Sequence, residues 1–426
     1  MENKRFLIVG AGMTGLAFAD HIQDDDYLIV EAQSEIGGYC RTVVQDGFVW
    51  DYSGHFFHFR HPEIEAELIR RMAGQKVRRV QKQSKIWYGD RYVDFPFQKN
   101  IHQLPQEEFL ECLVELFERP ESKKPENFLE MLEVKFGRGI AERFLIPYNE
   151  KLYATDLARL DVEAMGRFFP HAQLGEIIRN FRAADNQSYN STFTYPEGGA
   201  IQYVHALASD IPPSRIALNE ALIHLDLRNK VAKTTKREIK FEHLISSLPF
   251  DRLLRLASLP HDPAIFSYNK VEVFNLGFDR KGPEDVHWIY YPQRELSFYR
   301  VGFYDNIFDT PRMSIYVEIG RRQDFELDAS TVPYTLDRVL ADLRAAGIIT
   351  DQKLISSHHV LLDPAYVHIT RDSIAEVEKQ KALLETRGIY SMGRYGSWTY
   401  CAIEDNIVEA RALADRFNAL AALPGR

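Results

Sequence analysis

The sequence predicts an α/β protein in which a nucleotide-binding domain is divided between the two ends of the chain. A helical domain and an antiparallel β-sheet domain are inserted between its parts. Residues 5–22 form a short apolar strand, a glycine-rich turn and a helical stretch. A helical pattern fills 105–181, alternating strands occupy much of 271–360, and a strand followed by a helix covers 388–420.

The glycine-rich turn after the first strand is typical of dinucleotide binding by a Rossmann-type unit. Gly10, Gly12 and Gly15 form a G-x-G-x-x-G between a strand and a helix. They permit the tight turn, the close approach of a pyrophosphate and the packing of helix against strand. A second apolar strand at 27–30 ends at Glu31, where a carboxylate can accept hydrogen bonds from a ribose.

A second glycine motif follows the acidic residue and bears on which dinucleotide binds. Glu31, Gly37, Gly38 and Arg41 resemble the E-x(5)-G-G-x-x-R segment of FAD proteins of the amine oxidase and glutathione reductase type. In those proteins the backbone of this loop runs along the pyrophosphate. The resemblance implies bound FAD rather than NAD, although Arg41 could instead be a surface cation.

The remaining pattern sets the order of the domains. Residues 85–96 read as a hairpin turning at Gly89-Asp90, 243–248 as a buried strand, and 335–345 as a helix among strands. We expect an FAD-binding domain, a β-sheet domain and a helical substrate-side domain. The FAD-binding parts are 1–80, 186–260 and 385–426, the sheet parts are 81–98 and 261–384, and the helical part is 99–185.

Composition is that of an ordinary globular enzyme. The chain has 426 residues, enough for two or three domains, with 45% apolar and 27% charged residues. Its formal net charge of −9 argues against nucleic-acid binding, and no apolar run is long enough to span a bilayer. Three separated cysteines give neither a disulfide framework nor a zinc site. We expect a cytoplasmic protein that could form a homo-oligomer.

Three further segments carry a more specific resemblance. They are P-F-Q-x-N at 96–100, P-Y-N-x-K at 147–151 and G-R-x-G-S-W-x-Y at 393–400. In this order the set resembles the UDP-galactopyranose mutase family, closer to its eukaryotic type. The resemblance implies a Rossmann-type FAD domain, an inserted helical domain and a six-stranded antiparallel sheet. It also implies a UDP-sugar substrate, with UDP-galactose favoured.

The family's reaction interconverts pyranose and furanose sugars without net oxidation. The resemblance implies covalent catalysis by N5 of reduced FAD, with NADPH or NADH as a possible reductant. The protein must hold a diphosphate that leaves and returns, a task suited to arginine. The sequence contains no recognisable nucleophilic triad or metal site, and this chemistry requires neither.

The resemblance also implies individual roles. Arg300 and Arg167 match arginines that clamp the substrate pyrophosphate, although Arg167 could instead be a helix-surface cation. His55 matches a histidine beside the flavin, with a structural role as the alternative. Arg394 matches an arginine on the FAD side. Substrate-binding residues are implied at Phe97, Gln98, Asn190, Tyr290, Tyr366 and Tyr400, where each tyrosine alone could be core packing.

The chain also departs from the family pattern. The family's Gly-Gly-His is Ser53-Gly54-His55 here, which removes one glycine from the loop facing the flavin. Ala402 stands where the bacterial type places an acidic residue. These departures lie near the sugar and bear on the identity of the sugar more than on the reaction type.

Two other functions remain open from the sequence. One is an FAD-dependent oxidase or desaturase of the amine oxidase or protoporphyrinogen oxidase type, which would consume oxygen. The pair Arg300 and Arg167 argues against a cleft for an uncharged substrate. The other is a flavin-binding partner protein without catalysis, which would show no turnover despite bound FAD.

Overall fold

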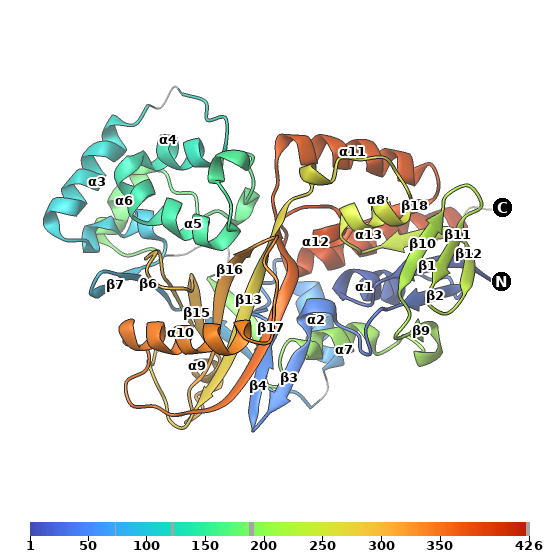
Figure 1. Cartoon of the computed structure of the whole chain (residues 1–426), viewed down its shortest axis with the longest axis horizontal. Coiled ribbons are helices and arrows are strands. Elements are labelled where there is room, and N and C mark those ends of the chain that lie inside the picture. Colours follow the sequence, from blue (N-terminus) through green and yellow to red (C-terminus); the bar gives the residue numbers. More distant parts are fainter. Residues whose placement is uncertain (73, 121–122, 187–190, 423–426) are drawn as a thin grey trace.

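The computed structural model describes residues 1–72, 74–120, 123–186 and 191–422 and contains two large β-sheets. One sheet and its helices form the end of the molecule that carries both termini, and the other lies at the centre (Figure 1). A group of helices covers one end of the central sheet (Figure 1). The predicted mixture of a Rossmann-type unit, inserted helices and a largely antiparallel sheet is confirmed.

The first sheet joins the two ends of the chain. Strand β1 (Glu2–Val9) pairs in parallel with β2 (Tyr27–Val30) and with β12 (Glu238–Ser246), and β12 pairs in parallel with β18 (Ile389–Ser391). Strand β1 is central because Phe6, Leu7 and Ile8 are fully buried between helical layers. The outer strands are β9 (Ile216–Ala217), β10 (Leu222–Asp226) and β11 (Val231–Thr234).

Helix α1 (Met13–His21) follows β1 directly and packs beside α13 (Ile403–Ala421), although almost 400 residues separate them in the sequence. Both helices bury small and apolar residues against the sheet, so the chain's last element completes its first one. The helices α2 (Pro62–Arg71) and α7 (Ile201–Ala208) belong to the same core, and α8 (Phe250–Leu256) and α11 (Arg371–Glu385) lie near β18 (Figure 1).

The second sheet has seven strands rather than the six that the resemblance implied. The order is β17-β13-β16-β15-β14-β6-β7, and every pair is antiparallel except β14 with β6. A parallel pair is possible there because the two strands are distant in sequence and need no tight turn between them. The strands are β6 (Ser84–Tyr88), β7 (Arg91–Asp94), β13 (Tyr268–Phe278), β14 (Trp288–Tyr290), β15 (Arg300–Phe303), β16 (Ser314–Arg322) and β17 (Leu354–Val367).

The predicted hairpin over 85–96 is β6 and β7, which join the edge of this sheet. The predicted helix at 335–345 is the C-terminal part of α10 (Thr331–Ala345), which packs on one side of the sheet (Figure 1). The strand β5 (Val77–Gln81) pairs with β8 (Thr192–Pro196), and β3 (Thr42–Gln45) pairs with β4 (Phe48–Asp51). These short pairs lead the chain from one large sheet to the other.

The helical region contains α3 (Gln106–Glu118), α4 (Phe128–Ile140), α5 (Ile146–Tyr153) and α6 (Leu174–Arg182). The side chain of Asn127 caps α4 by accepting a hydrogen bond from the Glu130 amide. A π-helical turn over Ala141–Leu145 joins α4 to α5 and brings Phe144 and Tyr148 toward the central sheet. The helices therefore supply one wall of a cavity.

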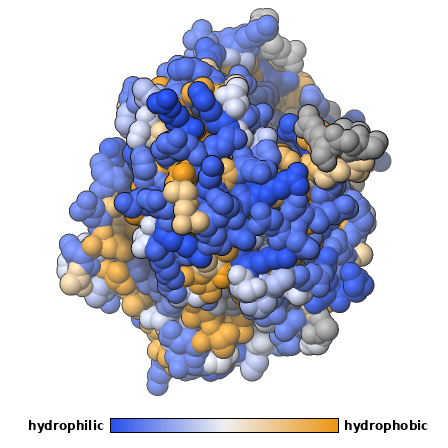
Figure 2. Space-filling view, turned by 90° about the vertical axis from the view of Figure 1, so that its right-hand side faces the viewer, coloured by the Kyte–Doolittle hydropathy of each residue, from blue (hydrophilic) through white to orange (hydrophobic). Residues whose placement is uncertain are grey.

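The face at the end that carries β10 and β11 is largely hydrophilic, with smaller hydrophobic areas in its lower part (Figure 2). In the part of the chain that the structure describes, no helix combines the length and apolarity needed to cross a membrane.

Candidate active site

One cavity runs from the first glycine turn to the central sheet. At one end it is lined by Gly10, Gly12, Glu31, Gly38 and Arg41, and at the other by residues of β14, β15, β16 and β17. The lining residues of the second end include His55, Phe95, Tyr148, Tyr290, Tyr299, Arg300, Glu318, Tyr366, Arg394 and Tyr400. The dinucleotide end and the proposed substrate end therefore belong to a single continuous space.

Two of the three motif glycines are required by the protein itself. Gly10 has φ +102°, and a Cβ there would overlap the Ser247 hydroxyl. A Cβ on Gly15 would overlap the carbonyl oxygen of Gly10. At Gly12 the nearest protein atom to an added Cβ is the Cα of Gly38, at 4.0 Å. The two glycine backbones are thus in contact, and both line the end of the cavity where a pyrophosphate would bind.

Glu31 and Arg41 hold the loops that form this end. The Glu31 carboxylate accepts hydrogen bonds from the amides of Ala11, at 2.8 Å, and Gln33, at 2.9 Å. Arg41 donates from Nε to the Gly38 carbonyl at 2.9 Å. Both side chains line the cavity, so each can fix the loop and contact a bound ligand.

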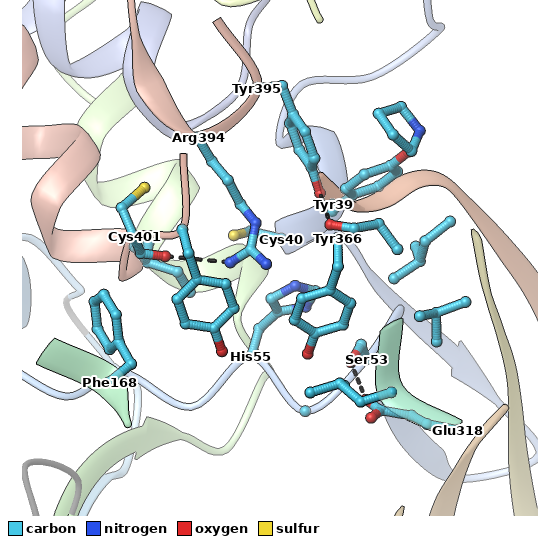
Figure 3. A pocket seen from close by; sticks show the side chains of 18 of the residues that line it. Tyr39, Cys40, Ser53, His55, Phe168, Glu318, Tyr366, Arg394, Tyr395 and Cys401 are labelled. Carbon is cyan, nitrogen blue, oxygen red and sulfur yellow. Dashed lines mark hydrogen bonds between the residues drawn. The ribbon is translucent and has the colours of Figure 1, made fainter. Parts of the chain in front are cut away.

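Arg394 reaches the middle of the cavity from α12 (Gly393–Gly396). Its amide donates to the side chain of Asn406, and its Nη1 donates to the Cys401 carbonyl at 3.2 Å. The guanidinium lies 5.1 Å and 4.7 Å from the ring centroids of Tyr366 and Tyr400 (Figure 3). Its Nε is buried and has no hydrogen-bond partner among the described residues.

Arg300 and Glu318 form a buried ion pair in the cavity wall. The two residues are directly opposite each other in the β15–β16 ladder. Arg300 donates from Nε to Glu318 Oε2 at 2.7 Å and from Nη2 to Oε1 at 2.8 Å. Burial alone would raise the pKa of Glu318, but the Arg300 charge and the hydrogen bonds from Arg300 and Ser53 lower it. Glu318 is therefore ionised.

Tyrosine hydroxyls surround this pair because neighbouring strands place them on the same face. Tyr290 is opposite Arg300 across the β14–β15 ladder, and its hydroxyl accepts a hydrogen bond from Trp288 Nε1 at 2.6 Å. Burial raises the pKa of Tyr290 to about 12, so it remains a neutral donor at physiological pH. The rings of Tyr366 and Tyr400 are stacked with centroids 5.7 Å apart. Neutral hydroxyls beside a guanidinium suit an anionic oxygen ligand.

His55 lies on the loop between β4 and α2 and faces the same space as Arg394 and Tyr366 (Figure 3). Its amide donates to the Ser53 carbonyl at 2.6 Å. Burial lowers the pKa of His55 to about 4, so the imidazole is neutral at pH 7. Its Nδ1 is buried and has no partner among the described residues, which leaves it available to a ligand.

Comparison with known proteins gives the family. The family model described as flavin containing amine oxidoreductase matches residues 13–416, most of the chain. The chain belongs to this family. Over 66 residues it is 33% identical to protoporphyrinogen oxidase 2, chloroplastic/mitochondrial, of Arabidopsis thaliana. That match spans 15% of this chain and only 13% of the plant protein.

Solved structures show the same fold. The crystal structure of reduced UDP-galactopyranose mutase matches 99% of this chain and 95% of its own, with a TM-score of 0.88 and 26% identity. A protoporphyrinogen oxidase-type protein of Exiguobacterium sp. 255-15 matches 97% of this chain and 98% of its own. Its TM-score is 0.76 and its identity 17%, which is a likeness of fold alone.

The cavity of this flavin-containing family member fits FAD. Gly10, Gly12 and Gly38 leave room for a pyrophosphate, and Glu31 lies at the end of β2 where a ribose is bound. The buried atoms His55 Nδ1 and Arg394 Nε lack protein partners, and a polar ring system would satisfy them. Among the residues that the structure describes, no group of three histidine, cysteine or acidic side chains could hold a metal.

Several residues expected at the site lie outside the cavity lining. Arg167 donates from Nη2 to both oxygens of Asp405, at 2.5 and 2.6 Å, and remains about one-third exposed. Phe97 is fully buried against Phe144. Gln98 is also fully buried, and its side-chain amide donates a hydrogen bond to the Pro170 carbonyl. Both lie behind lining residues. Asn190 falls outside the described residues.

Other residues of this amine oxidoreductase cavity were not assigned roles from the sequence. Tyr148, Trp288, Tyr299 and Tyr316 line it, and each was indistinguishable from core packing in a strand or helix pattern. Glu318 carried a clearer signal, because an acidic residue in the middle of the apolar strand β16 must have a buried partner.

Proposed function

We propose that the protein is a flavin-dependent mutase that interconverts the pyranose and furanose forms of a UDP-sugar, with UDP-galactose the favoured substrate. The catalytic group would be FAD in its reduced state. Reduced FAD supplies a nucleophilic nitrogen that can replace UDP at the sugar's anomeric carbon. The protein's own residues bind the diphosphate, orient the sugar and exclude water.

The observation that carries this proposal is the position of Arg300 in the cavity. Arg300 places a guanidinium in the wall of a cavity continuous with the dinucleotide cradle, and its Nη1 makes no hydrogen bond to the described residues. Glu318 holds the Nε and Nη2 edge, so the remaining donors face an incoming anion. The likeness to UDP-galactopyranose mutase over 99% of the chain supports the same assignment.

The surrounding groups have complementary tasks in this proposal. The hydroxyls of Tyr290, Tyr366 and Tyr400 donate to diphosphate oxygens, since burial keeps all three protonated. Arg394 provides positive charge next to the flavin. His55 is neutral and presents Nδ1 to the flavin side of the cavity. Arg167 would join the diphosphate site only after leaving Asp405.

The decisive experiment uses the purified flavoprotein under anaerobic conditions. The protein is reduced with dithionite, and in parallel with NADPH or NADH, and is then given UDP-galactopyranose or UDP-galactofuranose. Chromatography of the products should show interconversion with the reduced protein and none with the oxidised protein. UDP binding without conversion would mean a different sugar. If the protein neither binds UDP nor interconverts the sugars, the proposal is contradicted.

An FAD-dependent oxidase or desaturase is the second candidate. It is favoured by the carboxylate partners of both Arg300 and Arg167, which reduce the positive charge expected of a diphosphate site. The sequence match to a protoporphyrinogen oxidase also agrees with it. Steady oxygen consumption with an amine or a porphyrinogen, together with no UDP binding, would establish this alternative.

A further inference from the structure

Ser53 connects the flavin-side loop to the Arg300–Glu318 pair. Its hydroxyl donates a hydrogen bond to Glu318 Oε1 (Figure 3). The same oxygen accepts a hydrogen bond from Arg300 Nη2. Ser53 is buried, with 8% of its surface exposed, and the Glu318 side chain is 1% exposed. A buried carboxylate oxygen thus receives one donor from the loop and one from the arginine.

The same loop is attached to β16 at a second point. A Cβ added to Gly54 would overlap the Tyr316 hydroxyl, so the loop backbone lies directly against that ring. Tyr316 and Glu318 are two residues apart in the strand and therefore share one face. The Ser53 carbonyl accepts from the His55 amide at 2.6 Å and from the Tyr304 hydroxyl at 3.4 Å. Ser53 is thus fixed on both its main chain and its side chain.

We propose that Ser53 is a positioning residue that, through Glu318, sets which edge of Arg300 faces the cavity and connects this arginine to the loop carrying His55. The proposal rests on the proposed function in one respect, namely that the cavity receives a diphosphate. Glu318 can rotate about its own side-chain bonds, and the guanidinium follows it. The Ser53 hydroxyl is a third donor to the Glu318 carboxylate, beside Nε and Nη2 of Arg300, and it restricts that rotation.

The connection has a consequence for binding. With the Nε and Nη2 edge held, Nη1 is presented to an anion without the cost of ordering the side chain at the moment of binding.

The test measures UDP and inorganic pyrophosphate binding to the FAD-loaded protein by calorimetry, with the flavin oxidised and then reduced. Ser53→Ala and Ser53→Gly both remove the hydroxyl, and only glycine adds loop freedom. Ser314→Ala is the matched control: Ser314 is a buried serine on the same strand whose hydroxyl accepts from Trp50 Nε1 at 2.9 Å. FAD content and absorbance confirm folding of each variant.

We expect both Ser53 variants to weaken binding about tenfold, as for loss of a hydrogen bond to a charged group, while Ser314→Ala stays within about twofold. In a Glu318→Gln background, Ser53→Ala should have little further effect.

Three results would overturn the inference. They are unchanged binding in Ser53→Ala, an equal loss in Ser314→Ala, or a loss in Ser53→Gly alone. If the wild-type protein binds pyrophosphate but interconverts no UDP-sugar, the proposed function fails while the Ser53 test remains decisive. If it binds neither ligand, Arg300 is not an anion site and both fail.

Discussion

Arg300 and Glu318 are directly opposite each other on adjacent antiparallel strands, and the guanidinium donates two hydrogen bonds to the carboxylate. A second pair on the same sheet has the same chemistry. Arg321 donates from Nε to Glu272 at 2.8 Å, and Glu272 is fully buried. Glu272 and Arg321 do not line the cavity, so this second pair is a matched control for the proposed role of Arg300 and Glu318.

Arg300→Lys should weaken UDP binding about 10- to 100-fold, because lysine keeps the charge but cannot hold Glu318 and an anion with one planar fork. Bound FAD should be unchanged. Arg321→Lys, which alters the matched pair, should leave UDP affinity within about twofold. Calorimetric titration of both variants measures the difference, and equal losses would mean that Arg300 acts only through the sheet.

The glycines of the first turn should separate folding from FAD binding. Gly15→Ala places a Cβ against the Gly10 carbonyl and should destabilise the apoprotein by about 2 kcal/mol. Gly12→Ala meets no protein atom closer than 4.0 Å and should cost the apoprotein less than about 1 kcal/mol. It should nevertheless lose FAD. Urea unfolding and flavin content test this, and full FAD occupancy in Gly12→Ala would contradict it.

Asp405→Asn should strengthen UDP binding about two- to fivefold if Arg167 contributes to the diphosphate site, because it removes the charge that neutralises the guanidinium. Asparagine can still accept the hydrogen bond that the Ala402 amide donates to Asp405 at 2.7 Å, so the start of α13 is preserved. The UDP dissociation constant is the measurement. Unchanged affinity in both Asp405→Asn and Arg167→Ala would leave Arg167 a surface cation.

His368 should make the protein acid-sensitive. Burial lowers its pKa from 6.5 to about 4, and its ring nitrogens already contact Ser267 Oγ and the Tyr153 carbonyl, each at 3.0 Å. Between pH 4 and pH 6.5 the unfolded chain binds more protons at this histidine than the folded protein does. The contribution of neutral His368 to the free energy of unfolding is therefore complete above pH 6.5 and is lost as the pH falls toward 4.

For this one residue the loss between pH 7 and pH 5 is about 2 kcal/mol. Urea unfolding at both pH values should show a smaller pH dependence in His368→Gln than in the wild-type protein. The control is His205→Gln, which changes an exposed histidine on α7. An equal pH dependence in His368→Gln and the wild-type protein would show that folding does not lower the pKa of His368.

The sequence by itself determined the dinucleotide end of the site. Gly10, Gly12 and Gly15 follow β1 at fixed spacing, and Glu31 ends β2, so local order is enough to form the cradle. The segments at 147–151 and 393–400 also identified positions that reach the cavity, among them Arg394 and Tyr400. Short-range patterns predict these features because each depends on one turn or one strand end.

Tertiary structure decided the proposed substrate end of the cavity. Ser53 lies more than 200 residues before Arg300 and Glu318 in the sequence. Only the register of β15 and β16 brings Arg300 and Glu318 opposite each other. The pairing of Arg167 with Asp405 depends in the same way on where α13 begins. Strand register and helix docking are set by the burial of many apolar residues at once, so no local pattern reveals which buried charges will meet.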